Sequence, residues 1–229
     1  MIDYEAPSYH VQRHPEFLAD EELRHAWSCF ADRRYFEGVP EGARVLEYGG
    51  GLGNNLLAVA RRADTWMIEP SELGRHLAAG SGIAVARGIE ELCQRDFDAV
   101  LCRHVLEHLE DPFLTLRRIL DLLKPGGELI VAVPCENMRL FPSEEDLDHH
   151  LYCWSPRTLG NLIQRAGYRV GRIYFEYYAG KRRLLPLYRF LGGNVYAGAV
   201  RAAGRLFNCK ELVIRARKAV TRAGETESV

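Results

Sequence analysis

A glycine-rich loop at residues 49–53 has the composition of a binding site for a nucleotide cofactor. An apolar run ends in the carboxylate of Glu47, and alternating glycines follow it, namely Gly49, Gly51 and Gly53. Glycine leaves room for a ligand where a Cβ atom would collide with it, so such a loop keeps one wall of a pocket open. The third glycine falls one position too early for the G-x-G-x-x-G pattern of dinucleotide enzymes. The spacing therefore does not suit a pyrophosphate.

A second carboxylate, Glu69, follows the apolar run 64–68, about 20 residues beyond the glycines, where the second strand of a βαβ unit would end. A carboxylate at that point can accept hydrogen bonds from both hydroxyls of a ribose. Glu69 thus favours a cofactor that contains adenosine. An acid that only stabilises the N-terminus of the next helix is the structural alternative.

Two histidines, His149 and His150, precede an aromatic segment that contains Tyr152 and Trp154. Histidine has a pKa near neutrality and is the usual base for removing a proton from a hydroxyl group. The two histidines are therefore candidate catalytic residues, and the two aromatic residues are candidate substrate contacts. A histidine that only holds this loop against the following helix is an equally weighted alternative.

His104, Glu107 and His108 fit the pattern H-x-x-E-H, in which two histidines bind zinc and the glutamate is the general base. A zinc metallopeptidase is therefore a remote alternative, and Glu176 is the only distant acid that offers a third ligand. The pattern follows an apolar strand directly, and a helix start at Asp111 leaves little room for a long zinc-binding helix. A hydrogen-bonded pair that orders a turn is the favoured interpretation of Glu107 and His108.

Apolar runs and helix-forming segments alternate along the chain, and this alternation must position the candidate residues. Strands are expected near 43–48, 64–69, 82–87, 97–102, 126–133, 168–178 and 209–216. Helices are expected near 53–62, 71–79, 88–95 and 111–122, with one or two more in the first 40 residues. A further helix begins at Ser155, which caps it ahead of Pro156, and ends near Gly167. The pattern predicts an α/β fold with a doubly wound, mostly parallel sheet.

The 229 residues, 47% of them hydrophobic, suffice for one substantial core. We expect an N-terminal helical lid at 1–40, a main domain at 41–218 and a polar tail at 219–229. The net charge of −1 provides no basic field for nucleic acid. The six cysteines lack the spacing of a metal cluster or a disulfide framework, and no secretion signal or long apolar run occurs. The expected compartment is the cytoplasm.

Several motifs together resemble those of class I S-adenosylmethionine-dependent methyltransferases. They are the E-x-G-x-G-x-G loop that starts at Glu47, the V-L-E-H turn at 105–108 and the L-K-P-G-G segment at 123–127. The H-L-Y-x-W-S-P segment that starts at His150 resembles the small-molecule branch of that family, types 11, 12 and 23. The resemblance is specific from about residue 45 to 133. It implies a seven-stranded sheet of order 3-2-1-4-5-7-6, in which the last strand is antiparallel.

The resemblance also implies where S-adenosylmethionine lies. The residues expected near its methionine part are Glu47, Gly49, Gly51, Arg103 and His104. Glu69 is expected to bind the ribose, and Pro70 and Ile89 are expected to face the adenine. Many relatives have an aspartate where this chain has Ile89, so we expect adenine recognition to rest on backbone groups or on Glu90.

The function that the resemblance implies is methyl transfer to a small molecule. A histidine base favours a hydroxyl acceptor, such as that of a sugar or another biosynthetic intermediate. His150 matches the family's histidine and His149 is an extra one. Tyr9, a further candidate substrate contact, falls where relatives carry a lid over the cofactor. Transfer of a sulfonium methyl group needs no metal. The alternative is a non-catalytic or partner-activated protein that binds the cofactor, and the sequence does not indicate an oligomeric state.

Residues 181–207 interrupt the last two strands with a segment that is both apolar and basic. Basic amphipathic helices suit an anionic membrane surface or an anionic or lipid-linked acceptor. We therefore expect this helical insertion to cover the acceptor site and to allow peripheral membrane contact. A helix that packs on the sheet edge or on a second subunit, with its arginines in solvent, is the alternative.

Overall fold

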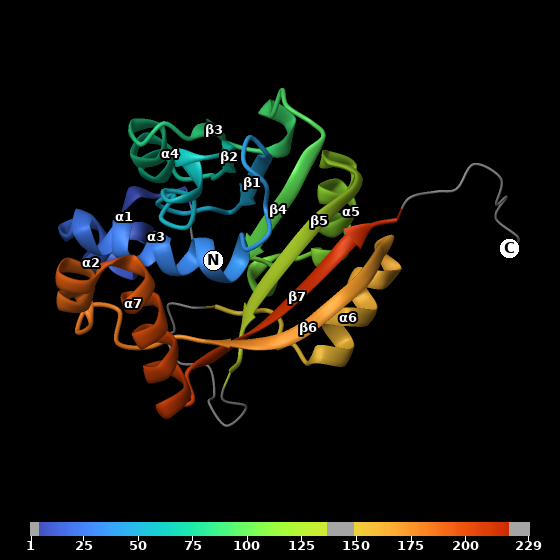
Figure 1. The fold of residues 1–229 in the computed structure, drawn as a ribbon. Coiled ribbons are helices and arrows are strands. Elements are labelled where there is room, and N and C mark those ends of the chain that lie inside the picture. The colour runs from blue at the N-terminus through green and yellow to red at the C-terminus, as the bar shows by residue number, and fades with distance from the viewer. Residues whose placement is uncertain (1–4, 137–148, 220–229) are drawn as a thin grey trace, which may run out of the picture.

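The computed structural model describes residues 5–136 and 149–219, which form a central sheet with helices on both faces (Figure 1). The seven strands lie in the order β3-β2-β1-β4-β5-β7-β6, and β7 is antiparallel to both of its neighbours. The strands are β1 (Arg44–Tyr48), β2 (Asp64–Ile68), β3 (Ala84–Ala86), β4 (Phe97–Arg103), β5 (Leu123–Pro134), β6 (Tyr168–Tyr177) and β7 (Lys210–Lys218). Their number, order and direction confirm the predicted fold.

Helices and short 3-10 helices connect these strands. The α-helices are α1 (Pro7–Arg13), α2 (Pro15–Ala19), α3 (Glu21–Tyr35), α4 (Glu72–Gly80), α5 (Pro112–Leu122), α6 (Pro156–Arg165) and α7 (Leu185–Leu206). The 3-10 helices are η1 (Val59–Arg61), η2 (Ile89–Glu91) and η3 (Leu106–His108). The start of α6 is as predicted, because Ser155 accepts a hydrogen bond from the backbone N–H of Thr158 at 3.1 Å.

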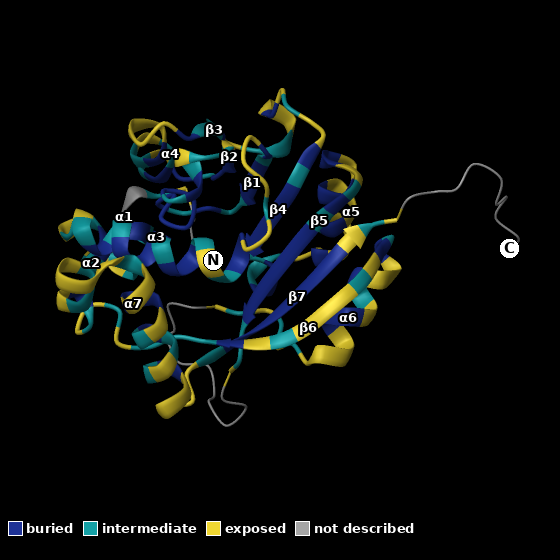
Figure 2. Cartoon of the chain, in the orientation of Figure 1, coloured by how far each residue is buried: buried dark blue, intermediate teal, exposed yellow. Residues whose placement is uncertain are grey.

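Two apolar clusters on opposite faces of the sheet fix the helices in place. Helices α3 and α7 bury Phe30 and Tyr196 in one cluster, whereas α5 and α6 bury Leu116 and Ile163 in the other. Successive residues of β4 alternate between the two clusters, as the alternation of side chains along a strand requires. Figure 2 shows β4 and β5 buried along most of their length, whereas the edge strand β6 carries exposed residues in its middle.

Two predicted helices are wrong. Residues 53–62 form turns that end in η1, and residues 88–95 contain only η2. In the first case the side chains of Asn54 and Asn55 accept hydrogen bonds from Arg24 and Trp27 of α3, at 2.7 and 2.9 Å. Asparagine that bonds in this way competes with helix formation, and the loop is held against α3 instead.

The N-terminal helices have two different roles. Helix α3 belongs to the core, where Leu23, Phe30 and Tyr35 are fully buried. Helices α1 and α2 lie at the carboxyl ends of β1 and β2 and carry residues that line the cavity described below. The boundary predicted at residue 40 would separate α3 from the core to which it contributes. The division of the chain at residues 40 and 218 stays a prediction.

Helix α7 occupies most of the predicted insertion and packs on α3 rather than standing free (Figure 1). A Cβ atom on Gly193 would lie 2.7 Å from Sγ of Cys29, and one on Gly204 would lie 2.2 Å from the backbone nitrogen of Tyr178. Glycine at these positions allows the close approach. The chain kinks at Gly192, whose φ is 83°. No helix in the described part of the chain is both long and apolar enough to cross a membrane.

Candidate active site

A cavity of about 650 Å³ opens at the carboxyl ends of β1, β2 and β4. Strand order reverses between β1 and β4, and this is the point at which doubly wound folds bind ligands. The wall combines the loop after β1 with residues from α1, α2 and the turn after β4. All the residues that the sequence predicts for the cofactor line this cavity: Glu47, Gly49, Gly51, Glu69, Pro70, Ile89, Arg103 and His104.

Glu69 is buried directly after β2 and connects three segments of the wall. The backbone N–H of Gly51 donates to its Oε2 at 2.8 Å, and the N–H of Ser71 donates to its Oε1 at 2.9 Å. Nε2 of His10, in α1, lies 3.4 Å from Oε1. The carboxylate is therefore held in a fixed orientation at the wall of the cavity. The contact with His10 was not predicted from the sequence.

Glu47 is the last but one residue of β1 and is 1% exposed. Its Oε1 accepts a hydrogen bond from Nδ2 of Asn55 at 2.5 Å, and Asn55 is held in turn by Trp27. Oε2 has no hydrogen-bond partner among the described residues. Burial raises the pKa of Glu47 to about 8, although the hydrogen bond from Asn55 opposes this shift. A cationic ligand group at this position would stabilise the charged carboxylate.

The glycines of the loop meet different requirements. Gly49 has a φ of 73°, and a Cβ atom there would lie 2.4 Å from Cγ2 of Val105, so the residue must be glycine for the loop to pack on the turn after β4. Gly51 has a φ of 57° and faces His10, with 3.5 Å between its ideal Cβ position and Cε1. Gly74 lets α4 approach the loop, because a Cβ atom there would lie 2.4 Å from the carbonyl oxygen of Gly51.

The predicted adenine end of the cavity is partly apolar. Pro70 and Ile89 line it together with Glu90 and Tyr48. The Glu90 carboxylate is paired with Nη1 of Arg118 at 3.1 Å, and both side chains are largely exposed. The apolar side chain of Ile89 therefore offers a surface on which a planar ring could pack.

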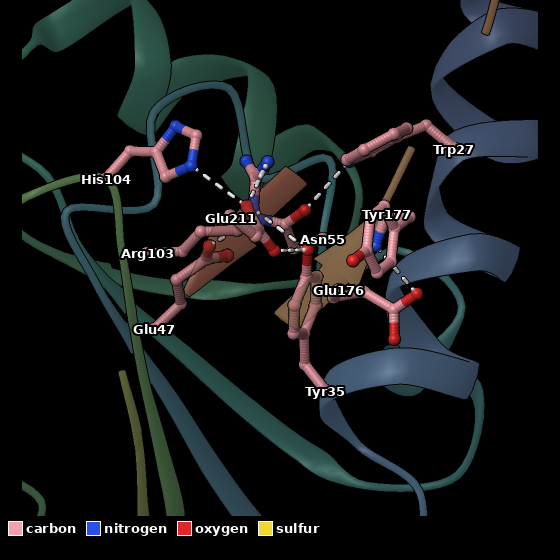
Figure 3. Close-up of polar contacts among 9 residues, drawn as sticks. All are labelled: Trp27, Tyr35, Glu47, Asn55, Arg103, His104, Glu176, Tyr177 and Glu211. Carbon is pink, nitrogen blue, oxygen red and sulfur yellow. Dashed lines mark hydrogen bonds and ion pairs between the residues drawn. The ribbon is translucent and has the colours of Figure 1, made fainter. Parts of the chain in front are cut away.

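A buried ion-pair network includes two residues of the cavity wall, Arg103 and His104, and joins β4 to β7 (Figure 3). Nη2 of Arg103 lies 3.0 Å from Oε2 of Glu211, and Nε2 of His104 lies 2.9 Å from the same oxygen. The hydroxyl of Tyr35 donates to Oε1 of Glu211 and accepts from Nε of Arg103, the latter at 3.1 Å. Glu211 is fully buried, so these partners are what stabilises its charge.

The network fixes the charge states of its members. Burial alone would raise the pKa of Glu211, but Arg103 and His104 lower it to about 2. Burial lowers the pKa of His104, and the neighbouring Arg103 lowers it further. The guanidinium of Arg103 also lies over three aromatic rings, 5.4 Å from the centroid of Trp27, 5.7 Å from Tyr35 and 5.3 Å from Tyr178. Glu211 and Tyr35 were not predicted, because neither belongs to a recognisable motif.

A second polar cluster forms where η3 meets the segment after residue 148. The rings of His108 and His150 are in an edge-to-face arrangement, with centroids 4.7 Å apart. The Glu107 carboxylate lies beside them, 3.9 Å from Nε2 of His108, and Nδ1 of His150 is paired with Glu136. The N–H of Leu151 donates to the backbone oxygen of Glu107 at 2.7 Å and so fixes the approach of the two segments.

Burial dominates the electrostatics of this cluster. It raises the pKa of Glu107 to about 8 and lowers the pKa of His108 to about 4, with a further lowering by His150. Neither carboxylate oxygen of Glu107 has a hydrogen-bond partner among the described residues. The favoured interpretation of Glu107 and His108, as a pair that only orders its turn, is therefore incomplete, because the structure brings His150 to the same place.

The predicted catalytic and substrate residues are only partly brought together. His150 and Tyr9 line the cavity, whereas His149, Tyr152 and Trp154 do not. His149 is exposed, and the rings of Tyr152 and Trp154 stack on each other with centroids 5.2 Å apart. The hydroxyl of Tyr152 donates to the backbone oxygen of Glu110 at 3.0 Å, which holds this aromatic pair outside the cavity. We therefore remove these three residues from the candidate site.

The H-x-x-E-H pattern does not form the helix of a zinc peptidase. His104 has a φ of 54° and lies in the turn after β4, whereas Glu107 and His108 belong to η3. Nε2 of His104 contacts Oε2 of Glu211 at 2.9 Å. The proposed third ligand, Glu176, is paired with Nε of Arg201 at 2.8 Å. The two histidines of the pattern thus belong to different clusters.

The fold, the glycine loop and the two buried acids of the cavity define a class I S-adenosylmethionine-dependent methyltransferase. The chain belongs to the methyltransferase domain family, whose model matches residues 11–172.

Two curated relatives show how the family's acceptors vary. Ubiquinone biosynthesis O-methyltransferase of Xanthomonas axonopodis pv. citri is 33% identical over 104 residues, which are 41% of this chain and 44% of that protein. tRNA U34 carboxymethyltransferase of Methylococcus capsulatus is 33% identical over 150 residues, which are 58% of this chain and 46% of that protein. The chain therefore spans less than half the length of both relatives.

Among solved structures, the complex of the Haloferax volcanii Trm112 methyltransferase activator with a methyltransferase has a TM-score of 0.64. The match covers 96% of this chain and 100% of the other, at 19% identity. At this level of identity the similarity concerns the fold alone.

Proposed function

We propose that this methyltransferase transfers the methyl group of S-adenosylmethionine to a hydroxyl group of a small molecule. The observation that carries the proposal is the cluster of Glu107, His108 and His150, which lines the same cavity as Glu69 and Glu47. The cavity thus offers carboxylates for an adenosine cofactor and, separately, imidazoles that suit a hydroxyl acceptor. A cofactor site and a group that can accept the hydroxyl proton suit methyl transfer to oxygen.

The cofactor orientation that we propose follows from the polar atoms of the wall. The unpaired Oε2 of Glu47 suits the ammonium group of the methionine part, because a cation there would stabilise a buried carboxylate. Glu69 suits the ribose hydroxyls, and Pro70 and Ile89 suit the adenine ring. In this orientation the chain's own residues bind and align the cofactor, and the sulfonium supplies the methyl group for an in-line displacement.

Activation of the acceptor is assigned to the polar cluster. The acceptor oxygen must lose its proton, and His150 stays the predicted residue for this step. Glu136 contacts its Nδ1 and orients the ring, as a carboxylate does for a catalytic histidine. His108 and the buried Glu107 surround the same position. The O-methyltransferase among the curated relatives is consistent with an oxygen acceptor.

A direct test is a methyl-transfer assay with isotopically labelled S-adenosylmethionine and a panel of acceptors. Phenols, sugars and quinol precursors would be compared with amines and with tRNA, since a tRNA-modifying relative makes nucleic acid the second candidate acceptor. We expect label in hydroxyl-bearing small molecules. Label only in amines or only in tRNA would contradict the proposal.

We predict that Glu69→Ala weakens binding of S-adenosylmethionine by about 1–3 kcal/mol, because a charged acceptor for the ribose hydroxyls is lost. Gly51→Val should also weaken binding, since its φ of 57° is strained for a branched residue. Glu72→Ala is the matched control, because Glu72 is exposed on α4 and does not line the cavity. Calorimetry measures all three. Unchanged affinity in both cavity variants would mean that the cofactor lies elsewhere.

The insertion at residues 181–207 contributes less to the cavity wall than we expected from the sequence. Lys181 lines the cavity, whereas no described residue of α7 does. The expectation that the insertion covers the site is therefore wrong for α7, and we propose α1 and α2, which line the cavity, as its lid. Lys181 is 2.7 Å from Glu16 and lies over the ring of Phe17, so it ties the start of the insertion to that lid.

We also propose that the outer face of α7 makes peripheral contact with an anionic membrane. Phe190, Leu206 and Phe207 are 82%, 78% and 67% exposed on a segment rich in arginine. We expect the protein to sediment with vesicles of anionic lipid at low salt, and Phe190→Ser with Phe207→Ser to reduce this binding. Neutral vesicles are the control. Equal sedimentation with both lipids, or none, would refute the contact.

A further inference from the structure

Three side chains with metal-binding chemistry meet at the wall of the cavity. One ligand atom each of Glu107, His108 and His150 lies within 4.8 Å of the others. His150 comes from a segment that is distant in sequence, and two hydrogen bonds hold it there. The N–H groups of Leu151 and Tyr152 both donate to the backbone oxygen of Glu107, at 2.7 and 3.3 Å. Backbone hydrogen bonds, and not side-chain conformations alone, therefore bring His150 close to Glu107 and His108.

An independent observation, the state of the Glu107 carboxylate, favours a cation ligand at this place. Glu107 is fully buried, and in the described part of the chain neither of its carboxylate oxygens has a hydrogen-bond partner. Leaving a buried carboxylate without partners is costly, and native proteins satisfy such groups with hydrogen bonds or metal ions. The guanidinium of Arg103, which acts on Glu107 electrostatically, is already engaged by Glu211 and Tyr35.

The donor set defines the class of ion. Two imidazoles and one carboxylate suit divalent transition metals such as Zn²⁺, Mn²⁺, Fe²⁺ or Co²⁺, and three protein ligands leave a position open for substrate. Glu136 contacts Nδ1 of His150. Histidines that bind a metal through one ring nitrogen commonly have a carboxylate at the other, and this carboxylate orients the ring. We propose that Glu107, His108 and His150 bind one divalent transition-metal ion at the acceptor end of the cavity.

The role of this ion rests on the proposed function. The bound ion would hold the acceptor hydroxyl at its open position and lower the pKa of that hydroxyl, so that its proton would pass to solvent water and His150 would serve as a ligand in place of a base. A lone pair of the oxygen then forms the O–CH₃ bond while the S–CH₃ bond breaks, and the electron pair of that bond goes to sulfur. The products are the methyl ether and neutral S-adenosylhomocysteine. This differs from the expectation, drawn from the sequence, that transfer needs no metal.

The test measures metal binding by the full chain after removal of metals with a chelator. Mn²⁺ and Zn²⁺ are titrated by calorimetry, and Co²⁺ by its visible absorption spectrum. We expect one ion per chain, and at least about 100-fold weaker binding in Glu107→Gln and His108→Ala. Glu107→Gln is close to isosteric, so it keeps the fold measurable. His76→Ala is the matched control, because His76 is exposed on α4, and Cys153→Ser excludes binding through a nearby thiol.

The proposed site would be contradicted if the wild-type protein bound no stoichiometric metal ion. It would also be contradicted if Glu107→Gln and His108→Ala bound the ion as tightly as the wild type. Calorimetry with S-adenosylmethionine on the same metal-free protein separates this result from failure of the proposed function. Cofactor binding should survive metal removal, whereas transfer to a hydroxyl acceptor should fall at least about 100-fold and return on addition of the ion. Full transfer by the metal-free protein would overturn the role of the ion, and loss of cofactor binding in every form would instead count against the proposed function.

Discussion

Glu211→Ala is expected to lower the free energy of unfolding by about 3–5 kcal/mol, the largest stability change that we predict for a single substitution. The substitution would leave the guanidinium of Arg103 buried without its carboxylate partner, which lies 3.0 Å away in the wild type. It would also remove the acceptor for the hydroxyl of Tyr35 and for His104. Denaturation with urea, followed by circular dichroism, measures the change.

The control is Glu22→Ala, which removes an exposed ion pair with Arg189 and should change stability little. The effect of Glu211 should also depend on pH. Its pKa in the folded state is lowered to about 2 from an ordinary value of 4.5, so its stabilising effect is full above pH 4.5 and is lost as the pH falls towards 2. A Glu211→Ala variant as stable as Glu22→Ala would show that the network is not a stabilising element.

His150→Ala is expected to lower the rate of methyl transfer by about 10²-fold or more and to leave the affinity for S-adenosylmethionine unchanged. His150 lies with His108 and Glu107, whereas the carboxylate of Glu69 is held by Gly51 at another part of the wall. The loss should occur whether His150 acts as a base or as a metal ligand. Single-turnover kinetics measures the rate, and calorimetry measures the affinity.

The neighbouring variant His149→Ala makes this prediction specific. His149 is exposed and does not line the cavity, so its removal should affect the rate far less than that of His150. A parallel loss of cofactor affinity or of thermal stability in His150→Ala would assign the residue a structural role. Equal rate losses in the two variants would mean that the loop as a whole, and not one imidazole, supports the reaction.

The sheet and the position of Glu69 could be predicted because they depend on local patterns. The central strands β1, β4 and β5 contain apolar runs, and in a parallel sheet the residues just after such runs meet at one edge. Glu47 and Glu69 both follow from this rule, and the structure has them at the ends of β1 and β2. The helix predicted at 53–62 was wrong because side chains of α3 bind Asn54 and Asn55, a contact between segments that no local pattern reveals.

The rest of the site depends on contacts between distant parts of the chain. Glu211 meets Arg103 because β7 runs antiparallel to β5, which places Glu211 opposite Pro134. His150 meets Glu107 through backbone hydrogen bonds of the residues that follow it, and His10 meets Glu69 because α1 covers the cavity. The family resemblance implies the strand order, but it does not predict that Glu211 pairs with the buried Arg103.

The most direct test of the central claim is a calorimetric titration of the wild-type protein with S-adenosylmethionine, S-adenosylhomocysteine and NAD. Our account predicts one site per chain with micromolar affinity for the first two ligands, because Glu69 and the glycine loop suit adenosine and Glu47 suits an ammonium group. It predicts no such binding of NAD, because the third glycine is misplaced for a pyrophosphate. Binding of NAD in preference to S-adenosylmethionine, or no binding of either adenosine cofactor, would contradict it.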